Sequence, residues 1–122
     1  MLFRSATSSG KILLAHLPAE ERAALLTETG LKKVTPRTIT AKTKLEKNLA
    51  EARERGYAWA LEELELGLHA MAAPVRDRDG EVIAALSASG PAYRLSEERL
   101  HELAPVLVKG AEEISHRMGY LG

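Results

Sequence analysis

The chain has 122 residues, with 17 Lys and Arg against 17 Asp and Glu, so its formal net charge at pH 7 is zero. This length suits one ordinary domain, and 45% hydrophobic with 28% charged residues is typical of a folding chain rather than a disordered one. A neutral total excludes a dedicated nucleic-acid or membrane-surface binder, which needs a basic excess. The absence of cysteine excludes disulfides, thiol catalysis and Cys-ligated zinc.

No segment of the sequence is suited to cross a membrane. The longest uninterrupted apolar run is far shorter than the roughly 20 residues that span a bilayer. The residues after Met1 also lack the basic, apolar and small-residue order of a signal peptide. We therefore expect a soluble, cytoplasmic protein without a membrane partner.

Two helices and a loop are predicted at the start of the chain. The first helix covers residues 6–17, where small polar residues precede an apolar stretch that Pro18 closes. Pro18 also suits the first turn of a second helix, because its fixed φ angle is already helical, and Gly30 ends that helix. Residues 31–40 contain Pro36 and three threonines without periodicity, which indicates a loop with room for a short extended piece.

A third helix is predicted to end at Gly56. Its apolar residues recur at the i, i+4 and i+7 positions of one helical face, namely Leu45, Leu49 and Ala52. The charged residues around them are of mixed sign, so we interpret them as a solvated face rather than a binding surface.

Three strands are predicted after Gly56, and the last two form a hairpin. They cover residues 57–61, 68–75 and 81–89, which lack helical periodicity. The Asp79–Gly80 pair supplies the positive φ angle of a tight turn between the last two strands. The sequence therefore predicts antiparallel pairing of these strands.

A long final helix is predicted after Ser96, a good N-cap that Glu97 and Glu98 follow in the first turn. One apolar stripe runs along this helix and consists of Leu100, Leu103, Leu107, Ala111, Ile114 and Met118. Pro105 interrupts the stripe, so we expect a kink or a break there.

The sequence carries no recognisable catalytic or metal-binding motif. Its four histidines have neither an i, i+4 pair nor an acidic partner at ligand spacing, so we expect no metal site. No serine lies in a nucleophile elbow, and residues 8–11 depart from a phosphate loop because Ile12 stands where Ser or Thr is needed. We interpret Glu62, Glu63 and Glu65 as charges at a strand end or in a turn. We expect neither an enzyme nor a cofactor.

Two polar features go beyond what a hydrophobic core requires. Ser8 and Ser9 stand at the start of the first predicted helix, where free N–H groups and the helix dipole favour a carboxylate. Ordinary N-capping is the simpler interpretation of this feature. Strand alternation puts Ser87 and Ser89 on one face of the sheet, where solvent or local hydrogen bonds would also satisfy them. Together the features describe a small pocket, but composition alone does not decide between this pocket and the simpler interpretations.

Several segments, in their order and spacing, resemble the effector-binding domain of the isocitrate lyase regulator (IclR) family of bacterial transcription factors. The resemblance covers nearly the whole chain, and its specificity lies in the set rather than in any one segment. The matching segments are residues 6–11 with Leu14 and Ala15, 35–40, 55–58, 63–67, 72–77 with Gly80, 84–91, and Arg94 with Leu95.

The resemblance implies an N-terminal winged helix-turn-helix that binds an operator and a C-terminal domain that binds a small metabolite and oligomerises. Residues 1–122 resemble only the later part of the C-terminal domain, so we expect a truncated effector-binding domain from which the DNA-binding domain is absent. The implied fold class is α+β, a profilin-like or GAF-like antiparallel sheet flanked by helices. The implied partners are a small organic acid and further copies of the chain, as a dimer or tetramer, with DNA bound only through the absent domain.

By position, the family's effector-binding residues fall on Ser8, Ser9, Ala60, Ala70, Ser87 and Ser89. These include both polar features found from the residues alone. The sequence departs from the family at Ala60, where the family often has Asp, so the implied pocket lacks a charged wall. The pattern of residues 63–68 is closer to the branch of the family that controls degradation of aromatic acids.

The function that these observations favour is ligand sensing and oligomerisation in an IclR-type regulator, where the effector controls operator binding allosterically. The alternative is a GAF-like sensory module of another signalling protein, which the sequence upstream would distinguish. A small hydrolase is disfavoured, because no nucleophile is paired with a base.

Overall fold

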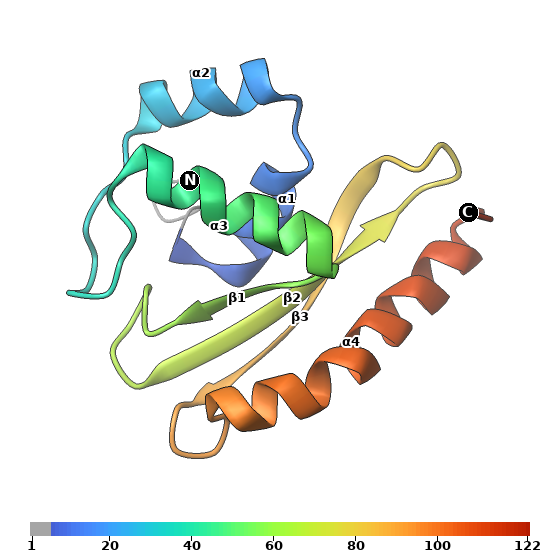
Figure 1. The fold of residues 1–122 in the computed structure, drawn as a ribbon. Coiled ribbons are helices and arrows are strands. Elements are labelled where there is room, and N and C mark those ends of the chain that lie inside the picture. Colours follow the sequence, from blue (N-terminus) through green and yellow to red (C-terminus); the bar gives the residue numbers. More distant parts are fainter. Residues whose placement is uncertain (1–5) are drawn as a thin grey trace.

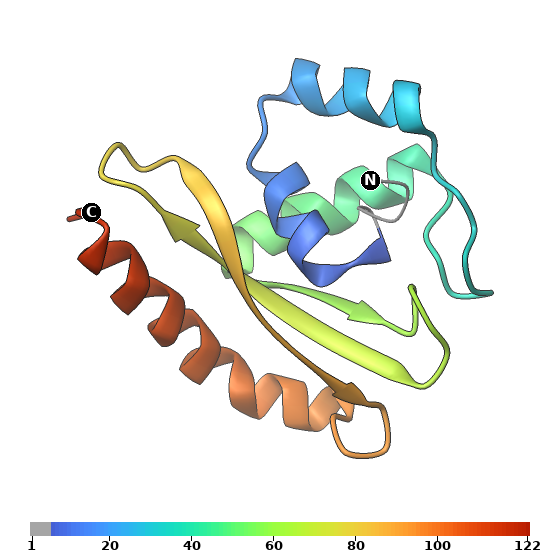
Figure 2. The same ribbon diagram turned by 180° about the vertical axis from the view of Figure 1, so that it is seen from behind.

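The computed structural model describes residues 6–122, and it consists of one antiparallel sheet between two layers of helices (Figure 1). The strands lie in the order β1-β2-β3 and comprise β1 (Ala58–Leu61), β2 (Leu68–Arg76) and β3 (Val82–Pro91). One face of the sheet is covered by α1 (Ser8–Ala15) and α3 (Lys42–Arg55), on which α2 (Ala19–Thr29) packs away from the strands, and the other face is covered by α4 (Glu97–Arg117) (Figure 2). The predicted α+β fold, an antiparallel sheet flanked by helices, is confirmed. None of the described helices is long and apolar enough to cross a bilayer.

The helices begin and end at the caps that the sequence provides. The Thr7 hydroxyl accepts a hydrogen bond from the N–H of Gly10 at 3.0 Å and so caps α1. Gly56 ends α3 in the left-handed region, with a φ angle of 89° that favours glycine. Ser96 caps α4 by accepting from the N–H of Arg99 at 3.3 Å. The predicted helices are thus confirmed, and the first is two residues shorter at each end than expected.

The two faces of the sheet carry side chains of different size. Alternation along β1 and β2 places the short side chains of Ala58 and Ala72 on the α1 face, where Ile12 packs against them. On the α4 face, Met71 packs against Leu100 and other larger side chains. The alanines let α1 approach the strands closely, which brings its first turn near the sheet.

Of the kink or break predicted at Pro105, the break does not occur, because the last helix continues past this residue. Proline removes one backbone donor from a helix interior, but Leu100 and Ala104 before it and Ala111 after it are buried. Packing along the whole sheet therefore keeps both halves of α4 in one continuous helix.

The apolar stripe predicted for α4 is wrong near the C-terminal end. Ile114 and Met118 are 40% and 51% exposed, whereas the neighbouring Ser115 is 2% exposed. The Ser115 hydroxyl accepts from the N–H of Arg76 at 2.8 Å, next to an irregularity in the β2–β3 register, and donates to the carbonyl of Ala111 at 2.8 Å. The sheet thus presents a backbone donor at this point, and a polar residue turns inward to satisfy it.

The outer edge of β1 is protected by side chains, whereas the outer edge of β3 is open. At the outer edge of β1, the Arg55 Nε donates to the carbonyl of Tyr57 and the Lys11 Nζ to the carbonyl of Trp59, each at 2.9 Å. In the part of the chain that the structure describes, no strand pairs with the outer edge of β3, which carries no charged residue. Uncharged open edges accept further strands. β3 is therefore the edge suited to extend the sheet.

Candidate functional site

One pocket brings together all six residues that the sequence predicts for the site. It has a volume of about 180 Å³ and lies between the first turn of α1, the three strands and the turn after β1. Ala6, Thr7, Leu64 and Leu68 complete the wall formed by Ser8, Ser9, Ala60, Ala70, Ser87 and Ser89. A larger hollow of about 450 Å³ between β2 and the C-terminal half of α4 contains none of the six.

The strand register places both serines of β3 on the pocket side. Ala70 is paired with Ala60 on one side and with Ser89 on the other, and Ala72 is paired with Ser87. Because alternate side chains point to the same face, these residues share the α1 face of the sheet. The predicted placement of the two hydroxyls on one face is confirmed. Both serines remain exposed in this structure, whereas Ala60 is buried.

The first turn of α1 forms the opposite wall. Ser8 is buried and Ser9 is half-buried, and their backbone N–H groups have no acceptor within the helix. Thr7 caps the N–H of Gly10, so capping accounts for part of this polar segment and is performed by Thr7 rather than by the serines. The positive end of the helix dipole lies at this turn. The wall is therefore suited to an anionic group.

The rest of the pocket wall is apolar. Leu64, Leu68, Ala60 and Ala70 line it, and no charged side chain of residues 6–122 does. Position 60 is alanine, so this part of the wall carries no carboxylate. A ligand with one anionic end and an apolar body matches this division.

A buried ion pair next to the pocket was not predicted from the sequence. The Lys11 Nζ donates to Glu63 Oε2 at 2.8 Å and to the carbonyl of Trp59 at 2.9 Å. The Lys11 side chain is 0% exposed and that of Glu63 is 9% exposed. Burial lowers the pKa of Lys11, although the Glu63 carboxylate favours the charged form and opposes this shift.

The ion pair corrects the interpretation of Glu63 as one of three similar turn charges. All three glutamates follow β1 in the turn, as predicted, but Glu63 is 7% exposed as a residue and points inward. The sequence did contain a signal. The buried residues of α1 are Ser8, Gly10, Lys11, Ile12, Leu14 and Ala15, and Lys11 lies at helical spacing from Ser8 and Ala15, on one face of the helix. A lysine on such a face requires a buried acidic partner.

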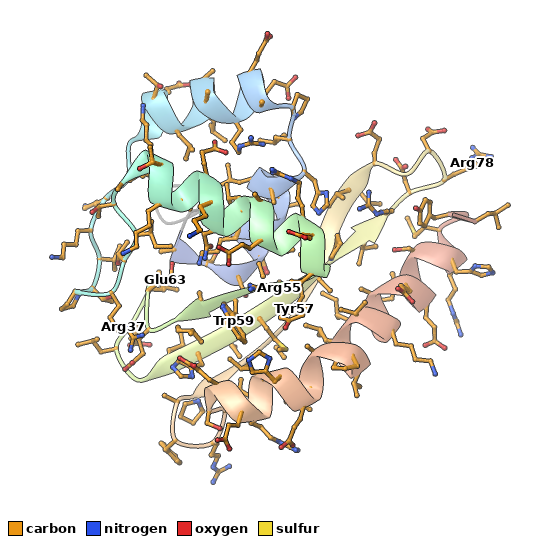
Figure 3. All side chains as sticks on the ribbon, in the orientation of Figure 1. Arg37, Arg55, Tyr57, Trp59, Glu63 and Arg78 are labelled. Carbon is orange, nitrogen blue, oxygen red and sulfur yellow. The ribbon has the colours of Figure 1, made fainter. Side chains whose placement is uncertain are left out.

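An aromatic cluster flanks the outer edge of β1. The Arg55 guanidinium lies 4.7 Å from the ring centroid of Tyr57 and 4.8 Å from that of Trp59 (Figure 3). The Trp59 ring meets His101 edge-on at 4.9 Å. Within residues 6–122, no three His, Asp or Glu side chains converge as a metal site would require.

Residues 2–116 of this α+β domain match the family model described as "Bacterial transcriptional regulator IclR C-terminal". The chain is 46% identical over 114 residues to the HTH-type transcriptional regulator KdgR of Escherichia coli strain K12, covering 93% of the chain and 43% of KdgR. The chain therefore belongs to the IclR family of bacterial transcriptional regulators and corresponds to part of its C-terminal domain. It spans less than half the length of the relatives that it matches.

Solved structures agree with this assignment. The crystal structure of the C-terminal domain of E. coli KdgR superposes with a TM-score of 0.88 at 44% identity, covering 96% of this chain and 71% of that one. A double mutant of the inducer-binding domain of the transcription factor PobR from Acinetobacter, in complex with 3-hydroxybenzoic acid, gives a TM-score of 0.87 at 35% identity, covering 92% and 65%. These relatives are named as transcriptional regulators or transcription factors.

Proposed function

We propose that this chain is the ligand-sensing and self-associating part of an IclR-type regulator and that its effector is a small organic acid. The observation that carries the proposal is the pocket of about 180 Å³ that all six expected residues line. The proposed carboxylate meets the N–H groups of Ser8 and Ser9 and the hydroxyls of Ser87 and Ser89. The 3-hydroxybenzoic acid bound by the PobR domain supports an aromatic acid as the ligand class.

The shape and charge of the pocket favour aromatic or longer-chain acids over very small ones. Ala60 and Ala70 leave space beside the polar end, and Leu64 and Leu68 offer apolar contact to the body of the ligand. Glyoxylate has no apolar body that could contact these leucines. Each buried methylene group contributes about 0.8 kcal/mol. Acids that bury more apolar carbon atoms against the leucines should therefore bind more tightly.

Operator binding is proposed to occur through a winged helix-turn-helix outside residues 1–122. An effector that binds one arrangement of the oligomer more tightly than another shifts the population and so changes DNA affinity at a distance. We place the regulator in the cytoplasm, where its operator would lie. Membership of the IclR family speaks against the alternative of a GAF-like module in another signalling protein.

The proposed self-association uses the open side of the sheet. The outer edge of β3 is unpaired over the described residues, and Ile83 on this strand is 48% exposed. Val106 and Ile114 on α4 are 68% and 40% exposed. An open strand edge and exposed apolar side chains each favour association. We propose a dimer or a tetramer.

Calorimetric titration with matched ligands tests the ligand class. Benzoate, 3-hydroxybenzoate and a dicarboxylate are compared with glyoxylate, with the uncharged benzamide and with the cationic benzylamine. We expect an aromatic acid to bind most tightly, benzamide to bind more weakly than benzoate, and benzylamine not to bind. If the best ligand is cationic or uncharged, the proposed site is wrong.

A further inference from the structure

Lys11 lies where three walls of the pocket are joined, although it does not line the pocket itself. It belongs to the same helix as the two serines of the first wall. Its Nζ donates to the carbonyl of Trp59 at 2.9 Å, next to Ala60, and to Glu63 Oε2 at 2.8 Å, next to Leu64. One ammonium group thus ties α1 to strand β1 and to the turn that presents Leu64.

The turn of residues 62–67 is also held from its other side. The hydroxyl of Thr35 donates to the carbonyl of Glu62 at 2.6 Å, and the hydroxyl of Thr38 donates to the carbonyl of Glu63. Glu62 has a φ angle of 60°, a left-handed conformation that non-glycine residues adopt only where their surroundings impose it. Thr35 and Thr38 therefore anchor the backbone of the turn on the side away from Lys11.

The ion pair is the part of this support that faces the pocket wall. A buried charge is costly unless it is paired and hydrogen-bonded, so Lys11 and Glu63 must stay together while both are buried. The position of Glu63 fixes that of Leu64, the next residue. Loss of the pair would release Leu64 without removing any group that touches the ligand.

We propose that the Lys11–Glu63 ion pair is a positioning device that sets the separation between the first turn of α1 and the side chain of Leu64. This separation determines how long an acid the pocket selects. The inference rests on the proposed function, because it assumes that the acid binds between these two walls. Lys11 and Glu63 act through the wall residues and do not contact the ligand.

The test compares affinities for benzoate and acetate by calorimetry in the full chain. Lys11→Met and Leu64→Ala should each lower the ratio of benzoate to acetate affinity roughly tenfold, because the aromatic ring loses its contact with Leu64 while acetate never had one. The double variant should lower it no further than either single change, since both remove the same contact.

Arg22→Met is the matched control for loss of a buried cation. The Arg22 side chain is 8% exposed and donates to Glu46 at 2.8 Å and to the carbonyl of Leu17 at 3.0 Å, away from the pocket. This control should lower the melting temperature, as Lys11→Met does, but leave the affinity ratio unchanged. An equal change of the ratio in both variants would overturn the proposal, as would an unchanged ratio in Lys11→Met.

Hydrogen exchange of the unliganded chain separates failure of this inference from failure of the proposed function. Amides of residues 62–67 should exchange faster in Lys11→Met than in wild type and Arg22→Met. If wild type binds neither these two acids nor the other acids of the calorimetric panel, the proposed function fails, while unchanged exchange overturns the positioning role by itself. Should Lys11→Met not fold, Lys11→Met/Glu63→Met decides, because this double variant removes the ion pair without leaving an unpaired buried charge. An unchanged affinity ratio in this double variant overturns the proposal.

Discussion

Ala70 on β2 and Ser89 on β3 are direct partners in the antiparallel ladder, and both line the pocket. A shift of this register by one residue would turn the β3 serines to the α4 face. The hairpin turn at residues 77–80 sets the register, because the N–H of Asp77 donates to the carbonyl of Glu81 at 2.9 Å. The polar chemistry of the pocket therefore depends on the turn at the far end of the strands.

Replacing Ser89 by Ala should weaken binding of the preferred acid without changing the fold. A hydrogen bond to a charged group contributes roughly 1.5 to 3 kcal/mol and a neutral one roughly 0.5 to 1.5 kcal/mol. We therefore expect affinity to fall from several-fold to about a hundredfold, and Ser87→Ala to act in the same direction. Calorimetric titration measures the affinity, and circular dichroism checks the fold.

Thr43→Ala is the control for this prediction. Thr43 is exposed on α3 and lies outside the pocket, so loss of its hydroxyl should leave acid affinity at the wild-type value. If Ser87→Ala and Ser89→Ala both behave like Thr43→Ala, the serines do not contact the ligand.

The helices, strands and hairpin were predictable because their signals are local. Glycine at position 56 ends α3 by its own conformational freedom, and alternation along β3 places Ser87 and Ser89 together whatever the rest of the chain does. The other pocket residues, such as Ala60 and Ala70, were named only through the family resemblance. Alanines carry no chemical signal of a binding site.

The Lys11–Glu63 pair shows what local signals leave out. The two residues are 52 positions apart, and the sequence offers several carboxylates of equal chemistry near Glu63. Only the packing of α1 on the sheet selects one of them. The same holds for Ser115, whose burial depends on a backbone donor of Arg76 that the β2–β3 irregularity exposes.

Ile83→Lys should weaken self-association of the chain. Ile83 is 48% exposed on the open strand β3, and lysine on an edge strand opposes pairing with another chain. We expect light scattering to report at least a dimer for wild type at micromolar concentration and a smaller species for the variant. A wild-type monomer would refute the proposed self-association. Val34→Lys is the matched control, because it also replaces an exposed apolar side chain by lysine but lies outside β3 and α4.

The isolated chain should show no sequence-specific DNA binding. Its net charge is zero, and neutralising phosphates requires a basic excess. A gel shift at low salt with the upstream intergenic DNA tests this expectation. A discrete shifted band that survives competitor DNA would contradict it.

Stability should fall as the pH drops below 6.5, in part because of His16 at the C-terminal end of α1. Burial lowers the pKa of His16 below its usual 6.5, and the positive charges of Arg76 and Arg53 lower it further. The stability that its neutral form contributes is complete above pH 6.5. Between that value and the lower folded pKa, the unfolded chain binds more protons than the folded chain, so the free energy of unfolding decreases.

Thermal unfolding of wild type and His16→Gln at pH 7.5, 6.5 and 5.5 measures this effect. Glutamine cannot bind the proton, so the variant should lose less stability than wild type over this range. The Nε2 atom of His16 is buried without a hydrogen-bond partner among the described residues, which leaves the protonated ring nothing to donate to. His116→Gln, an exposed position on the last turn of α4, controls for the loss of a histidine elsewhere. If both variants follow the wild-type curve, His16 does not cause the acid sensitivity.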